Sequence, residues 1–238
     1  MAFAQRLAII AGGVGGIGSA TGKLLHSHGA KIALLYAPFE AARVQPTIQS
    51  TYGPDSGTQA YECDITSPTS VSAAFAAIAK AQIAFPSILI NTAGYVNLTP
   101  LESTPPEDSL KHYMINLYGP TLTSQAFARL YLAAAQQAKL QGAAVPGGRI
   151  VSLASQAAFV ALHAHGAYCA SKAGLIGLTK CMASEWGPLG ITANTVSPGP
   201  VWTELGKKAW SDRGVREAYQ AAVRSIVPSS PDFEGRVD

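Results

Sequence analysis

The chain has 238 residues, 48% of them hydrophobic, which suits one α/β domain over residues 1–238 with a sheet covered on both faces. The net charge is only +3, no basic block occurs, no apolar run could span a bilayer, and no secretory pattern opens the chain. These features give no case for nucleic-acid or membrane binding and favour a cytoplasmic protein. The three cysteines lack metal-type spacing, so we predict reduced thiols and no metal site.

Short apolar runs alternate with helical patterns along the chain. The predicted strands cover residues 6–11, 31–36, 59–63, 87–91, 149–153 and 191–196. The predicted helices cover residues 19–28, a segment that begins at Ser67-Pro68, 107 to about 137, 166–186 and 209–226. Repeated β–α alternation predicts a single doubly wound parallel sheet in three layers, Rossmann-like, with right-handed crossovers.

The first strand runs directly into a glycine-rich turn at residues 12–18, and a helix follows it. Backbone N–H groups and the positive end of the helix dipole would face a pyrophosphate there, and missing side chains would let it approach. Gly12, Gly16 and Gly18 are the glycines that we expect to matter. A glycine-rich turn alone is equally typical of a flexible linker, and the flanking strand and helix favour the phosphate site.

Tyr168 and Lys172 lie four residues apart in the helix predicted for 166–186, and Ser155 lies thirteen residues before the tyrosine. Positions i and i+4 share a helix face, so the phenol and the ammonium could enter one pocket. An ammonium about 6 Å away stabilises a phenolate by roughly 3 kcal/mol at an effective dielectric of about 20. Lys172 is therefore predicted to lower the pKa of Tyr168, although such pairs also occur by chance on many helices.

These residues resemble the NAD(P)-dependent short-chain dehydrogenases/reductases. The chain looks most like the branch that contains 3-oxoacyl-acyl-carrier-protein reductases and related carbonyl reductases. The resemblance runs from about residue 7 to 205 and rests on residues 11–18, Asp64, 91–94, Asn116, Ser155, 168–172 and 198–203. It implies an enzyme that interconverts a small-molecule carbonyl and a secondary alcohol with NAD(P)(H), and it makes 3-oxoacyl thioesters one candidate substrate class.

The resemblance also implies roles for individual side chains. Tyr168 would exchange the proton with the substrate oxygen, and Ser155 would donate a hydrogen bond to that oxygen. Lys172 would hold the ribose and lower the tyrosine pKa, and Asn116 would hold a water linked to Lys172. The other cofactor contacts it implies are Gly12, Gly16, Ile17, Gly18, Tyr36, Asp64, Ile65, Asn91, Ala93, Gly94, Tyr168, Lys172, Pro198, Gly199, Val201 and Thr203.

The sequence gives a separate reason to single out Asn116. Pro120 has no N–H, so the carbonyl four residues earlier, that of Asn116, loses its helical partner. We expect a kink there that leaves an acceptor for a water molecule. The alternative is a plain helix break at Gly119-Pro120.

The end of the second predicted strand departs from the family pattern. Preference for NAD usually shows as an acidic residue there, and this chain has Tyr36. Position 15, basic in many NADP-binding relatives, is Gly15, and the nearest downstream cation is Arg43, preceded by Glu40. Because no carboxylate would repel a 2′-phosphate, we predict NADP(H) over NAD(H).

The C-terminal region is the second departure. We expect residues 200–226 to form a substrate lid, and no strand-like run follows them, so the sheet is expected to lack a last strand. A homo-oligomer is predicted: a dimer on the helices near residues 107 and 166, with a tetramer in doubt. The small residues that would permit close helix approach are Ala170, Ala173, Gly174 and Gly177.

Two alternatives remain open. His163 and His165 lie between Ser155 and Tyr168, and we interpret them as substrate-facing loop residues because no third ligand is spaced to make a metal site. The fold could also serve a catalytically inactive dinucleotide-binding regulator or scaffold, or a non-redox enzyme such as an epimerase.

Overall fold

The computed structural model describes residues 1–204, 206 and 207. A six-stranded, fully parallel sheet has the order β3-β2-β1-β4-β5-β6. The strands are β1 Arg6–Ala11, β2 Lys31–Tyr36, β3 Gln59–Glu62, β4 Phe85–Asn91, β5 Gly148–Leu153 and β6 Ile191–Val196. The helices are α1 Gly16–Ser27, α2 Ala41–Thr51, α3 Pro68–Ala81, α4 Pro106–Tyr113, α5 Gly119–Leu140 and α6 Gly166–Trp186. Short 3₁₀ turns lie at Pro38–Glu40, Leu101–Ser103, Gln156–Ala158 and Gly187–Leu189.

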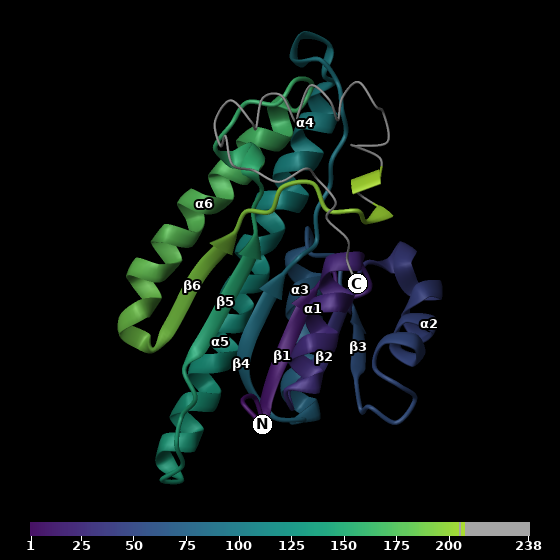
Figure 1. Ribbon diagram of the computed structural model, residues 1–238. Helices are drawn as coiled ribbons and strands as arrows, with labels where there is room; N and C mark the ends of the chain where they lie inside the picture. Colours follow the sequence, from purple (N-terminus) through teal and green to yellow (C-terminus); the bar gives the residue numbers. More distant parts are fainter. Residues whose placement is uncertain (205, 208–238) are drawn as a thin grey trace, which may run out of the picture.

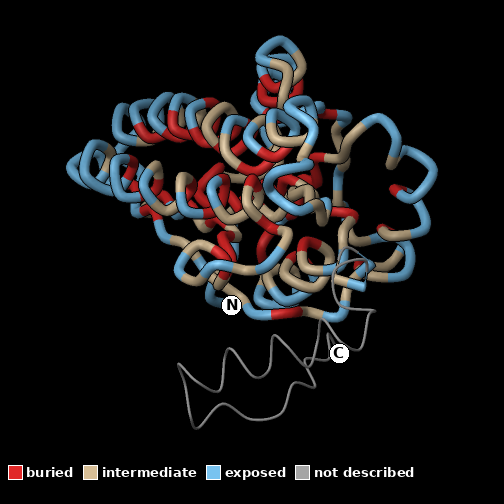
Figure 2. Tube along the Cα trace, turned by 90° about the horizontal axis from the view of Figure 1, so that it is seen from above, coloured by how far each residue is buried: buried red, intermediate tan, exposed pale blue. Residues whose placement is uncertain are grey.

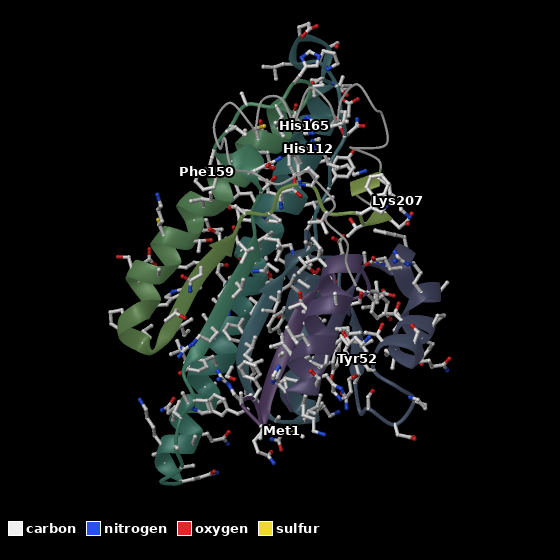
Figure 3. The ribbon with its side chains drawn as sticks, viewed as in Figure 1. Met1, Tyr52, His112, Phe159, His165 and Lys207 are labelled. Carbon is white, nitrogen blue, oxygen red and sulfur yellow. The ribbon has the colours of Figure 1, made fainter. Side chains whose placement is uncertain are left out.

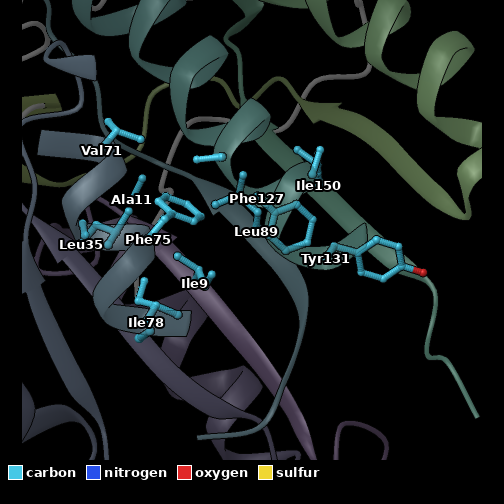
Figure 4. Packing of buried hydrophobic residues seen from close by; sticks show 14 of the residues in the cluster. Ile9, Ala11, Leu35, Val71, Phe75, Ile78, Leu89, Phe127, Tyr131 and Ile150 are labelled. Atoms are coloured by element: carbon cyan, nitrogen blue, oxygen red, sulfur yellow. The ribbon is translucent and has the colours of Figure 1, made fainter. Parts of the chain in front are cut away.

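Helices cover both faces of the sheet (Figure 1), as the apolar composition predicts. Alternate residues of one strand point to opposite faces. In β1, Ile9 packs into the cluster shared with α3, α5 and α6, whereas Ile10 packs into the cluster shared with α1 and α2. Figure 4 shows Ile9 in the first cluster with Phe75 and Phe127. The resulting three-layered α/β fold confirms the predicted fold class.

Buried residues concentrate along the middle of the molecule, and exposed residues line the outer sides of the helices (Figure 2). Ile9, Ile10 and Leu89 in the sheet have no exposed surface. Burying one such side chain contributes about 1.5–3 kcal/mol. The sheet is therefore a rigid support for the loops that leave its ends.

The carboxyl ends of the strands are aligned at one edge of the sheet, at the top in Figure 1. Ala11 of β1 pairs with Asn91 of β4, and Asn91 pairs with Ser152 of β5. Ligands of such sheets bind just beyond this edge. The glycine turn and the segments after β4, β5 and β6 all leave the sheet there.

The observed elements differ from the predicted ones in two places. The helix α2 was not predicted, because Pro46 lies inside it and reads as a helix breaker. The single helix predicted from residue 107 is divided into α4 and α5 by a π-helical turn, Met114–Tyr118. The predicted helix 209–226, most of the lid and the region expected to lack a last strand lie outside the described residues.

Candidate active site

The glycine turn joins β1 to α1 and leaves little room for side chains. Gly12 has φ +79°, a conformation that glycine adopts readily. A Cβ on Gly18 would lie 2.2 Å from the carbonyl oxygen of Gly12, and a Cβ on Gly12 would lie 2.6 Å from the nitrogen of Ala93. These two glycines therefore bring the turn, α1 and the segment after β4 into direct contact.

The N-terminus of α1 has the features of an anion site. Gly15 caps it without a side-chain hydrogen bond, and the first turn contains no acidic residue. The positive end of the helix and its N–H groups are thus not neutralised by the cap, which suits a pyrophosphate. Gly16 packs against Thr203 of the segment after β6, since a Cβ there would lie 2.7 Å from Thr203 Cγ2. Gly12 lies in the turn after β1, and Gly16 and Gly18 lie in the first turn of α1.

Ser155, Tyr168 and Lys172 come together beyond β5. Ser155 follows β5, and its Oγ accepts a hydrogen bond from the N–H of Ala157 at 3.1 Å. Lys172, one turn along α6 from Tyr168, donates from Nζ to the carbonyl of Leu153 at 2.7 Å. The three residues line one cavity with Ile17 in the first turn of α1.

The predicted effect of Lys172 on Tyr168 is wrong for this structure. Burial raises the pKa of Tyr168, and the polar side chain of Ser155 lowers it by a smaller amount. The Nζ of Lys172 lies 5.7 Å from the centre of the Tyr168 ring and is directed at a main-chain carbonyl instead. Desolvation of the phenolate therefore outweighs stabilisation by the ammonium.

Lys172 is itself buried, with 4% of its surface exposed. Burial lowers its pKa from 10.5 to about 8. The ammonium and neutral forms are thus closer in free energy than in a surface lysine. The side chain can hold a proton at neutral pH and release it under mildly alkaline conditions.

Substituting Lys172 with Met is expected to change the pH dependence of stability. The folded-state pKa lies below the unfolded value, so the unfolded chain binds more protons between about pH 8 and pH 10.5. The free energy of unfolding of the wild type should therefore rise across this window, by up to roughly 3 kcal/mol at about 1.4 kcal/mol per pH unit. Urea unfolding of both proteins at several pH values measures it. Parallel curves for wild type and variant would contradict the effect of burial.

Asn116 lies in the π-helical turn and is fully buried. Its Oδ1 accepts from the N–H of Tyr95 at 2.8 Å, and its Nδ2 donates to the carbonyl of Tyr95 at 2.8 Å and to Ser171 Oγ at 3.0 Å. The N–H of Gly119 donates to the carbonyl of Met114, five residues earlier. The chain therefore forms a π-helical turn close to where a kink was expected at Pro120. The side chain of Asn116 thus fixes the loop after β4, and any water would have to bind at its main-chain carbonyl.

The side chain of Asn91 points into the protein. Its Nδ2 donates to Ser124 Oγ and Ser152 Oγ, and its Oδ1 accepts from Thr123 Oγ1 at 2.8 Å. Asn91 can therefore border a cofactor only through its main chain. Its neighbour Thr92 donates from Oγ1 to the carbonyl of Ala11 at 2.7 Å and so joins the segment after β4 to the end of β1.

Three of the predicted cofactor contacts, Tyr36, Asp64 and Ile65, lie outside the cavity, near the carboxyl ends of β2 and β3. Tyr36 is half-buried at the end of β2, and Asp64 is exposed. One oxygen of Asp64 accepts two hydrogen bonds from Thr66, at 2.9 and 2.7 Å. Ile65 packs against Gly119, where a Cβ would lie 2.6 Å from its Cδ1. The predicted contact of Asp64 and Ile65 with an adenine ring stays a prediction.

The cavity contains both predicted and unpredicted residues. Those predicted are Ile17, Gly94, Ser155, Tyr168, Lys172, Pro198, Gly199, Val201 and Thr203. Those not predicted include Thr92, Val96, Gln156 and Leu162. Thr92 and Gln156 could have been predicted from their place in the sequence, since each directly follows a predicted site residue. His165, interpreted above as a substrate-facing residue, also lines the cavity.

In the described part of the chain, no helix is both long and apolar enough to cross a membrane. The same residues contain no group of three histidine, cysteine or acidic side chains placed to hold a metal ion. The three cysteines are free thiols.

A family model and several known dehydrogenases are similar to this chain in sequence. A family model described as enoyl-(acyl carrier protein) reductase matches residues 12–226. The D-threitol dehydrogenase of Mycolicibacterium smegmatis is 39% identical over 206 residues, covering 86% of this chain and 74% of the relative. The NAD-dependent glycerol dehydrogenase of Listeria innocua is 36% identical over 209 residues, covering 87% of this chain and 75% of the relative.

Solved structures agree with the sequence relatives. A dehydrogenase/reductase from Sinorhizobium meliloti 1021 superposes with a TM-score of 0.77 and 29% identity, covering 91% of this chain and 81% of that one. A gluconate 5-dehydrogenase from Burkholderia cenocepacia J2315, in complex with NADP and tartrate, gives a TM-score of 0.78 and 25% identity, covering 91% and 79%.

The fold, the glycine turn at α1, the Ser155–Tyr168–Lys172 cavity and these similarities agree with one another. The protein is an oxidoreductase that interconverts alcohols and carbonyls, and its cofactor is a nicotinamide dinucleotide. This chain belongs to the short-chain dehydrogenase/reductase family.

Proposed function

We propose that this protein is an NADP-preferring dehydrogenase of small polyols, with Tyr168 as its acid/base. The observation that carries the proposal is the shared cavity: Ser155 and Tyr168 line it together with Lys172 and with Ile17 in the first turn of α1. A proton-transfer group thus adjoins the expected phosphate site at one edge of the sheet.

Each residue has a separate role in the proposed alcohol oxidation. A bound nicotinamide ring supplies the hydride acceptor. Ser155, held by the N–H of Ala157, donates a hydrogen bond to the substrate oxygen. Tyr168 accepts the hydroxyl proton in oxidation and returns it in carbonyl reduction. Because burial raises the pKa of Tyr168, the phenol form prevails at neutral pH, which suits reduction, whereas oxidation is favoured at alkaline pH.

Polyols are the proposed substrate class because the quoted sequence relatives are named for D-threitol and glycerol. Further relatives are named for L-xylulose and D-arabinitol. The test is cofactor reduction over a panel of polyols with three to five carbons, with simple alcohols and 3-oxoacyl thioesters for comparison. Turnover confined to thioesters, or no turnover although the dinucleotide binds, would refute the polyol assignment.

NADP preference is supported by Arg43 of α2. Its Nη2 donates to the carbonyl of Val14 in the glycine turn at 3.1 Å, so the cation lies beside the turn that follows β1. Its Nη1 also forms a long ion pair with Glu40 Oε1, at 3.8 Å. The Arg43 side chain is nevertheless 55% exposed, so a ligand can reach it. Tyr36 at the end of β2 provides no carboxylate to repel a 2′-phosphate.

The Arg43→Ala variant is therefore expected to lower kcat/KM for NADP⁺ by about tenfold or more, with a much smaller change for NAD⁺. Lys80→Ala removes the same charge at the end of α3 and serves as the matched control. Steady-state kinetics with both nucleotides gives the ratio. An equal loss with NADP⁺ and NAD⁺ would show that Arg43 supports the turn and does not select the cofactor.

We also propose that the protein acts as a homo-oligomer in the cytoplasm, with α4, α5 and α6 as contact helices. Leu110 of α4 is 58% exposed, and Gly177 of α6 has no atom near its missing Cβ. Both features suit a helix face that a second copy covers. Light scattering measures the oligomeric state.

A further inference from the structure

One wall of the active-site cavity is formed by the segment that follows β4. Val96 of this segment lines the cavity together with Ser155 and Tyr168. The segment leaves the sheet after Asn91, so contacts other than strand pairing must fix its position. Val96 is apolar and half-buried, and its place decides how much room a substrate has beside the reacting oxygen.

The carboxylate of Asp108 binds both neighbours of Val96. Its Oδ1 accepts a hydrogen bond from the hydroxyl of Tyr95 at 2.6 Å, and its Oδ2 accepts one from Nδ2 of Asn97 at 3.0 Å. The bond with Tyr95 lowers the pKa of Asp108, and the same bond raises the pKa of Tyr95 to about 12. A neutral phenol thus donates to an ionised carboxylate, and such charge-assisted bonds are stronger than neutral ones.

The helix α4 places Asp108 and supplies a second contact to the same segment. Asp108 lies in the first turn of α4, where the helix dipole favours a negative charge. His112, one turn later, is 1% exposed. Its Nδ1 is 2.8 Å from the carbonyl oxygen of Asp108, and its Nε2 accepts from the N–H of Asn97 at 3.1 Å. Asn97 is therefore held twice by α4, through its side chain and through its main chain.

The same helix contacts the residue that carries the acid/base group. The centre of the His112 ring lies 6.3 Å from that of the Tyr168 ring. Figure 3 shows His112 near His165, at the beginning of α6. The wall segment and the phenol are thus fixed against one helix, so α4 sets the separation between Val96 and Tyr168.

We propose that Asp108 is a positioning residue that sets the size selectivity of the site. By binding Tyr95 and Asn97 it holds Val96 in the cavity wall, and this wall limits how large a group the reacting carbon of the substrate carries. The inference rests on the proposed function, which places the reacting oxygen at Tyr168. It goes further because Asp108 is not among the cavity residues in the described part of the chain and acts through Val96.

The test compares 1,2-propanediol with 1-phenyl-1,2-ethanediol, two vicinal diols whose secondary carbon carries a methyl or a phenyl group. Steady-state kinetics gives the size preference, which is the ratio of kcat/KM for the methyl diol to that for the phenyl diol. Asp108→Ala frees both neighbours of Val96, and Val96→Ala shortens the wall itself. We expect each variant to lower the ratio about tenfold. Because Asp108 acts through Val96, the double variant should lower the ratio little further.

Two further variants make the test independent of how well Asp108→Ala folds. Tyr95→Phe removes only the hydroxyl that donates to Asp108, and it should lower the ratio by about threefold. Glu107→Ala removes an exposed carboxylate from the same turn of α4 and is the matched control, which should leave the ratio unchanged.

An unchanged ratio in Asp108→Ala or in Tyr95→Phe overturns the inference. An equal fall in kcat/KM for both diols also overturns it, because a merely structural role would weaken both reactions alike. So does a double variant in which the effects of Asp108→Ala and Val96→Ala multiply in full. Wild-type protein that oxidises neither diol refutes the polyol function, and this inference with it. Wild-type protein that oxidises the diols, with a ratio that Asp108→Ala does not change, refutes the inference alone.

Discussion

The Tyr168→Phe variant is expected to lower kcat by about 10²–10⁴-fold while dinucleotide affinity stays nearly unchanged. The substitution removes only the phenol hydroxyl, from a cavity that Ser155 and Lys172 also line. The ring remains packed between His112 and His165, whose ring centres lie 6.3 and 6.0 Å away. Proton transfer to and from the substrate oxygen is thus lost without a change in the shape of the cavity.

Stopped-flow or steady-state assays give kcat, and quenching of protein fluorescence by NADPH gives the affinity. Tyr113→Phe in α4 provides the matched control, because its ring is 39% exposed and it does not line the cavity among the described residues. Turnover in Tyr168→Phe within threefold of the wild type would remove Tyr168 from the mechanism.

The Gly18→Ala variant is expected to lose about 1–3 kcal/mol of stability and to weaken dinucleotide binding more than tenfold. The new Cβ would lie 2.2 Å from the carbonyl oxygen of Gly12 and 2.8 Å from Thr92 Oγ1. The oxygen of Gly12 that the new Cβ would meet is a backbone atom, so it cannot move away as the end of a flexible side chain could. The glycine turn must move, and the N–H groups that face the phosphates move with it.

Thermal unfolding measures the loss, at about 2–4 °C for each kcal/mol in a domain of this size. The control is Gly187→Ala at the end of α6, where φ is −54° and no atom lies within 4 Å of the new Cβ. That variant should unfold within about 0.5 kcal/mol of the wild type. Similar behaviour of the two variants would contradict the close contact between Gly18 and Gly12.

The strands were predictable because buried parallel strands form continuous apolar runs. Arg6–Ala11 is such a run, whereas the edge strand Ile191–Val196 alternates buried and exposed residues over its first half; both strands are observed with the predicted bounds. The helix Ala41–Thr51 was not predictable from local pattern, because Pro46 opposes it and only packing of Val44 and Ile48 against the sheet favours it. Tertiary contacts override propensity at this point.

In the candidate site, too, some features could be predicted from the sequence and others could not. The grouping of Ser155, Tyr168 and Lys172 follows from helix periodicity and the alignment of strand ends, and both can be read from sequence. The pKa of Tyr168 could not be predicted, since it depends on the depth of burial and on which atom the ammonium of Lys172 meets. The inward direction of Asn91 likewise depends on three partners that are distant in the chain.

The π-helical turn Met114–Tyr118 has a consequence for protein engineering. Such a turn amounts to one residue more than a regular α-helix requires. Winding these same residues as a regular α-helix, without deleting one, would therefore rotate everything on one side of the turn by about 100° relative to the other. A designer who straightened the helix for thermal robustness in that way would detach Asn116 from Tyr95 and leave the segment after β4 without this anchor.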